Sequence, residues 1–119
     1  MARGVEHFNR GEFFQAHEEL EDAWRASSGE PRLFLQGLTQ AAVALHHHST
    51  GNREGATSVL ARALRNLESY PAEFAGIDLD SLRNDLRAVH SRLLEGTDPK
   101  VLPRIRFSAS GGEFPAESR

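Results

Sequence analysis

A histidine and several carboxylates interrupt the apolar face of an expected helix near the start of the chain. The stretch EFFQAHEELEDAW, residues 12–24, places His17 four residues before Glu21, so the two side chains are neighbours on the helix surface. With Glu18 they form the pattern H-E-x-x-E, one residue type away from the H-E-x-x-H of zinc proteases. Imidazole and carboxylate groups bind zinc and iron. The first chemical hypothesis is therefore a divalent metal site.

A second set of polar side chains lies on the next helix along the chain. Gln36, Gln40 and His47 fall on one side of this helix, which is otherwise apolar. A buried amide without a hydrogen-bond partner costs on the order of 1–3 kcal/mol, so these side chains need partners. The nearest polar side chains in the sequence are His17 and Glu21, and we predict that the two sets face each other.

Three functions are compatible with these polar side chains. A complete hydrogen-bond network would fix the packing of the helices in a scaffold or interaction domain. A metal-dependent hydrolase or oxygenase would hold zinc or iron with His17, Glu21 and His47, and Gln40 would orient a ligand. A small-ligand protein would line a pocket with the same groups. Whether the chain is an enzyme stays open. The candidate site residues are His17, Glu18, Glu21, Gln36, Gln40 and His47.

The bulk composition narrows the class of protein. A length of 119 residues is that of one domain with one modest core. The net charge of −3 argues against general nucleic-acid binding, because phosphate binding needs a basic surface. There is no cysteine, which excludes disulfides and thiolate chemistry. Because no apolar run is long enough for a membrane span or a signal peptide, we expect a cytoplasmic protein that does not bind membranes.

Helical periodicity dominates the chain as far as residue 95, and no strand alternation is evident there. Glycines mark the expected helix ends, and Asn52 and either Asp78 or Asp80 are the expected caps of the last two helices. We predict an all-α, compact bundle of about five antiparallel helices, with the third helix at its centre. The expected helices cover residues 2–9, 12–27, 31–50 and 53–69, and a fifth runs from the Asp cap to Gly96.

The C-terminal residues differ from the rest of the chain, because they lack the helical pattern. VLPRIRF, residues 101–107, is expected to lie on the bundle as an extended arm, and the polar residues after it are expected to be mobile. The chain therefore divides into a helical domain, residues 1–97, and an arm with its tail, residues 98–119. If the protein forms a homo-oligomer, we expect the arm to make the contact. The sequence identifies no other protein partner.

Five arginines and one tryptophan are expected to have structural or surface roles only. Trp24 is expected in the core. Five arginines of the last two helices are expected on outer faces, where interspersed acidic residues indicate a mixed charged surface. These arginines are Arg62, Arg65, Arg83, Arg87 and Arg92.

Two glycine-containing turns indicate a repeated helix–turn–helix unit. FNRGEFFQA and STGNREGAT resemble the turn of tetratricopeptide repeats, although their spacing is about 40 residues rather than 34. The same segments resemble the family called domain of unknown function 309, whose signature joins three motifs. The resemblance implies a compact all-α fold of prokaryotic origin and no assigned activity. The matching residues are Glu12, Phe13, Ala16, His17, Glu18, Leu20, Glu21, Trp24, Gly37, Leu38, Gln40, His47, Gly51, Asn52, Gly55 and Ala56.

Overall fold

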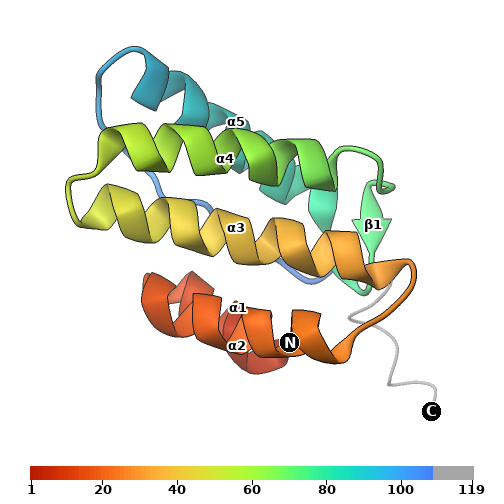
Figure 1. Ribbon diagram of the computed structural model, residues 1–119. Helices are drawn as coiled ribbons and strands as arrows, with labels where there is room; N and C mark the ends of the chain where they lie inside the picture. The colour runs from red at the N-terminus through yellow and green to blue at the C-terminus, as the bar shows by residue number, and fades with distance from the viewer. Residues whose placement is uncertain (109–119) are drawn as a thin grey trace.

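Helices form most of the fold, as the periodicity predicted (Figure 1). The computed structural model describes residues 1–108; the tail that was expected to be mobile lies outside them from residue 109 onward. Within the described part, no helix has both the length and the apolar composition needed to cross a membrane. The elements are α1 (Ala2–Asn9), α2 (Phe13–Ala26), α3 (Pro31–Ser49), α4 (Arg53–Leu67), β1 (Glu73–Phe74), β2 (Ile77–Asp78) and α5 (Leu79–Leu94).

The central helix is α3, which packs against α2 on one side and α4 on the other (Figure 1). Its apolar residues cover most of its circumference, so it buries side chains against both neighbours. Gly37 allows the close approach of α4, because a Cβ atom there would lie 2.7 Å from the side chain of Leu67. The predicted central position of this helix is confirmed.

The α1–α2 and α3–α4 connections repeat one backbone turn at an offset of 40 residues, from His7 to His47. In each turn, the residue after a glycine donates its backbone N–H to the carbonyl five positions earlier. The N···O distance is 2.9 Å from Glu12 to His7 and 2.8 Å from Asn52 to His47. Both glycines adopt left-handed backbone angles that a Cβ atom disfavours. They are Gly11, with φ of +79°, and Gly51, with φ of +84°.

A small hairpin replaces part of the loop expected between α4 and α5. β1 pairs with β2 in antiparallel register, and the two residues that join them, Ala75 and Gly76, have φ of 53° and 78°. Positive φ at both central residues is typical of the tightest hairpin turns. Strands of two residues are too short to show alternation, so they could not be predicted from the sequence pattern. Asp78 caps α5, since its side chain accepts a hydrogen bond from the N–H of Ser81 at 3.0 Å.

The C-terminal arm, residues 101–108, lies along the bundle as predicted and adds one bridge to the hairpin, between Ile77 and Phe107. Asn9 makes the two short hydrogen bonds that attach the arm to α1. The Asn9 amide donates to the carbonyl of Ile105 and accepts from its N–H, both at 2.8 Å. Ile105 is 1% exposed, so the arm contributes to the core.

One of the five arginines expected on outer faces is buried instead. Arg83 is 7% exposed, and its Nη1 donates to the carbonyls of Leu67 at 2.8 Å and Tyr70 at 2.7 Å. The last carbonyls of a helix have no partner within the helix, and here a side chain from α5 supplies one at the end of α4. The prediction of an outer position was wrong because it considered α5 without the loop that crosses it.

Candidate functional site

The candidate site is the surface groove between α2 and α3, where half-buried side chains from the two helices face each other. It contains two hollows, one of about 130 Å³ and one of about 170 Å³. We call their lining residues the α2–α3 groove. The smaller hollow is lined by Phe14, His17, Val43 and His46, and the larger by Glu21, Trp24, Gln36, Thr39 and Gln40.

The spacing of these residues explains why they share one groove. Phe14, His17, Glu21 and Trp24 follow one another at intervals of three and four, which places them along one face of α2. The α3 residues have the same spacing, and α3 returns antiparallel after the short loop that follows α2 (Figure 1). The start of one row therefore faces the end of the other.

His17 and Glu21 lie against each other at the wall of the groove, with 3.4 Å between Nε2 and Oε1. Their side chains are 26% and 32% exposed, and Glu21 also lies 3.3 Å from the guanidinium of Arg25. Solvent screens a pair of this kind, which typically contributes about 0–1 kcal/mol to stability. The expected facing of α2 and α3 polar groups is present at Glu21, but these groups are half exposed rather than sealed in the core.

An aromatic side chain separates two histidines in the smaller hollow. The ring centroid of Phe14 lies 5.8 Å from that of His17 and 5.5 Å from that of His46. Phe14 is 48% exposed, so half of a large apolar side chain is open to solvent. His46, and not His47, is the α3 histidine that lies opposite His17.

The remaining predicted residues have partners on other elements. Gln40 lines the larger hollow beside Gln36, but its Oε1 accepts a hydrogen bond from Asn66 of α4 at 2.6 Å. His47 lies at the α3–α4 turn, where its Nδ1 is 3.4 Å from the side-chain nitrogen of Asn52. Glu18 is exposed and lines neither hollow.

The geometry does not assemble a metal-binding set. Across residues 1–108, no group of three or more His, Asp or Glu side chains is placed to hold a metal ion. His17 and Glu21 provide two such groups, while His47 hydrogen-bonds within its own turn. The site has the chemistry of a mixed polar and aromatic surface.

Trp24 forms the floor at one end of the groove. It is half-buried and packs against the core, and the guanidinium of Arg32 lies 4.3 Å from its ring centroid. Its Nε1 is buried and has no acceptor among the described residues.

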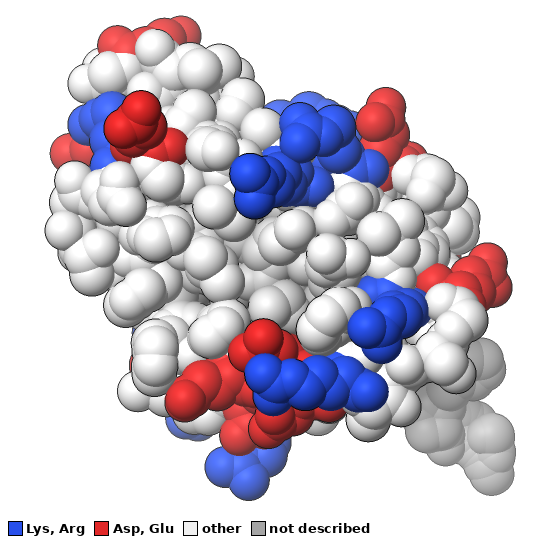
Figure 2. Space-filling model, viewed as in Figure 1, with Lys and Arg blue, Asp and Glu red and all other residues white. Residues whose placement is uncertain are grey.

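Charged side chains are unevenly distributed on this face of the molecule (Figure 2). Acidic and basic side chains gather over α2, arginine side chains gather over part of α4, and most of the surface over α3 between them is uncharged, except at its start, which contains Arg32. Arg25 compensates part of the α2 charge, at 3.3 Å from Glu21 and 3.6 Å from Asp22. On α4, Arg62 lies one helical turn before Asn66 and therefore on the same side as the Gln40 contact.

Sequence reasoning missed Phe14, His46 and Asn66. Phe14 precedes His17 by three residues, so helical spacing alone would have placed it beside a known candidate. The place of His46 in the hollow depends on how α3 is rotated about its axis, which spacing does not report. The contact of Asn66 required the packing of α3 on α4, which no motif reports.

Comparison with known proteins confirms the resemblance seen in the sequence. Residues 1–59 match the family described as "Domain of unknown function (DUF309)". An uncharacterized protein of Aquifex aeolicus (strain VF5) is 33% identical over 100 residues, which cover 83% of this chain and 30% of that protein. The uncharacterized protein YpuF of Bacillus subtilis (strain 168) is 35% identical over 92 residues, which cover 76% of this chain and 48% of that protein. The matched region is less than half the length of either relative.

Proposed function

We propose that this chain is a protein-interaction module and that its α2–α3 groove binds an α-helix of a partner protein. Its first 59 residues are similar to the domain of unknown function 309. The observation that carries this proposal is the pair of hollows in one line, with the half-exposed Phe14 at one end and Trp24 at the other. The repeat of two helical hairpins also supports it, because stacked hairpins typically present extended binding surfaces.

The spacing of the hollows suits a helix. Phe14 and Glu21, one in each hollow, are seven residues apart, which corresponds to about 10.5 Å along the α2 axis. Side chains at positions i and i+7 of a partner helix have the same separation. Helices that dock in grooves commonly use anchors at i, i+3, i+4 and i+7.

The size of the hollows favours single side chains over a small molecule. Pockets for drug-sized ligands typically have about 300–1,000 Å³. The hollows have about 130 and 170 Å³, so each accommodates a side chain rather than a cofactor. Net charge adds a requirement. Because α2 carries four carboxylates and one arginine, and α4 carries three arginines and one carboxylate, the partner helix has a basic edge toward α2 and an acidic edge toward α4.

A displayed library of amphipathic helical peptides tests the proposal. Peptides of about 18 residues provide five turns, enough to cover both hollows. We expect selected peptides to carry apolar residues seven positions apart. We also expect Phe14→Glu to weaken their binding at least about tenfold in fluorescence anisotropy, because it places a charge in an apolar contact.

Leu33→Glu is the matched control. Leu33 is 42% exposed, similar to Phe14, but it lines neither hollow. Circular dichroism verifies that both variants remain folded. The proposal fails if the library yields no binder, or if the two substitutions weaken binding equally.

The metal alternative has its own direct measurement. Metal content by inductively coupled plasma mass spectrometry, on protein purified without a His tag or chelator, would support it only if stoichiometric zinc or iron is found and His17→Ala removes it. We expect no such metal, because His17 and Glu21 supply two ligands and a catalytic zinc site typically uses three from the protein.

A further inference from the structure

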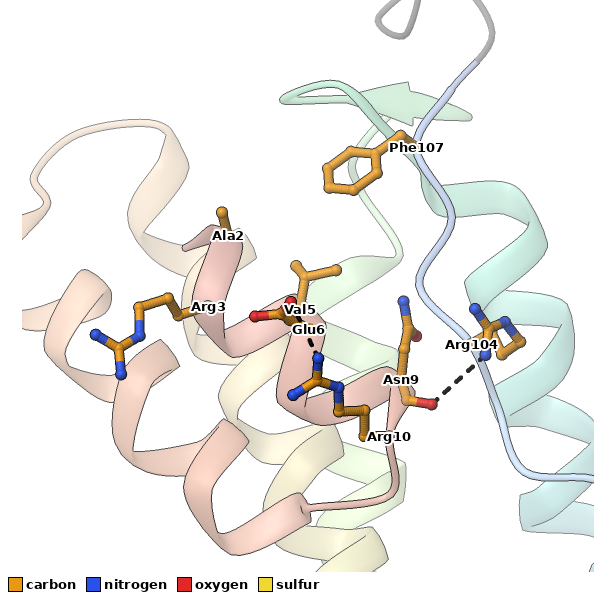
Figure 3. A pocket seen from close by; sticks show the side chains of 8 residues that line it. All are labelled: Ala2, Arg3, Val5, Glu6, Asn9, Arg10, Arg104 and Phe107. Atoms are coloured by element: carbon orange, nitrogen blue, oxygen red, sulfur yellow. Dashed lines mark hydrogen bonds and ion pairs between the residues drawn. The ribbon is translucent and has the colours of Figure 1, made fainter.

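A third hollow lies outside the α2–α3 groove, between α1 and the C-terminal arm (Figure 3). At about 590 Å³ it is several times larger than either hollow of the groove. We call it the α1–arm trough. Its lining residues are Ala2, Arg3, Val5, Glu6, Asn9, Arg10, Arg104 and Phe107.

The trough is a wedge that is closed at one end. At the closed end, the two hydrogen bonds between Asn9 and the backbone of Ile105 hold the arm on α1. At the other end the arm and helix diverge, and the Phe107 ring projects beside Ala2 and Val5 (Figure 3). The α1 wall extends from Ala2 to Asn9, about 10 Å at 1.5 Å per residue. This length matches three to four residues of extended chain.

Among residues 1–108, the arm presents one residue with unpaired backbone groups to this trough, the N–H and C=O of Phe107. On its other side the arm pairs with the hairpin, because the carbonyl of Arg106 accepts from Asp78 at 2.8 Å and the N–H of Ser108 donates to Gly76 at 2.9 Å. In an extended chain, alternate residues direct their N–H and C=O groups to opposite sides. Ile105 and Phe107 therefore direct theirs toward α1. Asn9 binds those of Ile105, whereas within residues 1–108 nothing binds those of Phe107.

Positive charge gathers at the closed end. Arg10 and Arg104 flank Asn9, one from the helix and one from the arm (Figure 3). Each guanidinium makes one long contact in the trough, Arg10 with Glu6 at 3.4 Å and Arg104 with the carbonyl of Asn9 at 3.5 Å. Arg3 extends away from this end, toward Glu19 at 3.8 Å. Most guanidinium N–H groups at the closed end are therefore available to an anion.

We infer that the α1–arm trough binds the C-terminal end of an extended peptide. The backbone of the peptide pairs with Phe107 as an added strand, and an apolar side chain lies on Val5 beside the Phe107 ring. The terminal carboxylate reaches the closed end, where Arg104 binds it. Arg10 leaves its contact with Glu6 and binds the same carboxylate. The three elements of the site, an open strand edge, an apolar floor and a cationic end, occur in the order that such a peptide requires.

Affinity selection on the full chain tests this inference. The probe is a library of random peptides of about six residues, roughly 20 Å when extended, with free C-termini. We expect selected peptides to have an apolar residue near the C-terminus. Their C-terminal amides should bind at least about tenfold more weakly, because a charge-assisted hydrogen bond is lost.

Two variants and two controls locate the binding. Arg104→Gln and Phe107→Asp should each weaken binding about tenfold or more. Arg87→Gln, which changes an exposed arginine of α5 that does not line the trough, should leave the dissociation constant unchanged, and so should Phe14→Glu in the α2–α3 groove. The inference is overturned if no peptide is selected, if amides bind as well as acids, or if Phe14→Glu abolishes binding. Because Phe14→Glu affects only the groove, failure of one site is distinguishable from failure of the other.

Discussion

The buried side chain of Arg83 binds the backbone carbonyls at the end of α4, and its loss should lower the stability of the fold. Arg83→Met keeps the apolar stem but removes the guanidinium donor from the carbonyls of Leu67 and Tyr70, and leaves the Leu67 carbonyl with the Tyr70 N–H at 3.4 Å. Hydrogen bonds from charged groups contribute about 1.5–3 kcal/mol, so we expect a loss of about that size in the free energy of unfolding. Urea denaturation followed by circular dichroism measures it.

Arg87→Met is the control for Arg83. Arg87 is exposed on the same helix and donates only to Asn84, at 2.9 Å. Exposed substitutions usually change stability by about 0.5 kcal/mol or less. Equal effects of the two substitutions would show that the buried contacts of Arg83 are energetically unimportant.

His17 leads to the opposite expectation. Its side chain is 26% exposed and its partner Glu21 is shared with Arg25, so His17→Ala should lower the free energy of unfolding by less than about 1 kcal/mol. The same substitution should weaken binding of a helical peptide, because His17 lines the smaller hollow. A loss of several kcal/mol in urea denaturation would instead identify His17 as part of a structural network.

At the scale of elements, the α3–α4 turn explains the G-N-x-x-G-A motif. The Asn52 side chain accepts a hydrogen bond from the N–H of Gly55 at 2.9 Å and caps α4. A Cβ atom at Gly55 would lie 2.5 Å from the Asn52 amide nitrogen. Glycine to alanine inside a helix normally stabilises by about 0.5–1 kcal/mol. Here we expect Gly55→Ala to destabilise, by about 1 kcal/mol, because the cap is displaced.

A double-mutant cycle checks this reversal of sign. In the Asn52→Ala background the clash is absent, so Gly55→Ala should become neutral or stabilising in thermal or urea unfolding. If Gly55→Ala stabilises the parent protein as well, the close contact with Asn52 does not constrain the turn.

The helices were predictable because local chemistry marks their ends. Gly11, Gly51 and Gly96 all have φ near +80°, and Asn52 and Asp78 are true caps. The groove was predictable only in part. Spacing along α2 brings His17 to Glu21, but whether His46 or His47 faces them depends on how α3 is rotated about its axis. That rotation is set by packing against α4, which the sequence of α3 alone does not specify.

At the scale of the whole molecule, the arm joins the first helix to the hairpin near the last one. Asn9→Ala removes both hydrogen bonds that hold Ile105 on α1. We expect faster amide hydrogen exchange at Ile105 and at Asp78, whose N–H donates to the arm at Arg106. Amides in α3 should show no acceleration of exchange beyond that caused by a change in global stability. Uniform acceleration throughout the chain would mean that the arm does not open as a separate unit.

Asn84→Ala serves as the control for Asn9→Ala, since Asn84 is exposed and, among residues 1–108, its side chain hydrogen-bonds only to Arg87 in the same helix. It should leave the exchange of the arm unchanged. A similar acceleration in both variants would assign the effect to a general loss of stability.

The Asn9–Ile105 contact links positions 96 apart, so it imposes an order of events during synthesis. The helical hairpins consist of local contacts and can form as they emerge, while the arm is translated after them. Until residue 105 has been made, the Asn9 side of α1 has no cover and the α1–arm trough does not exist. Any peptide that binds there would therefore distinguish chains translated through the arm from shorter nascent ones.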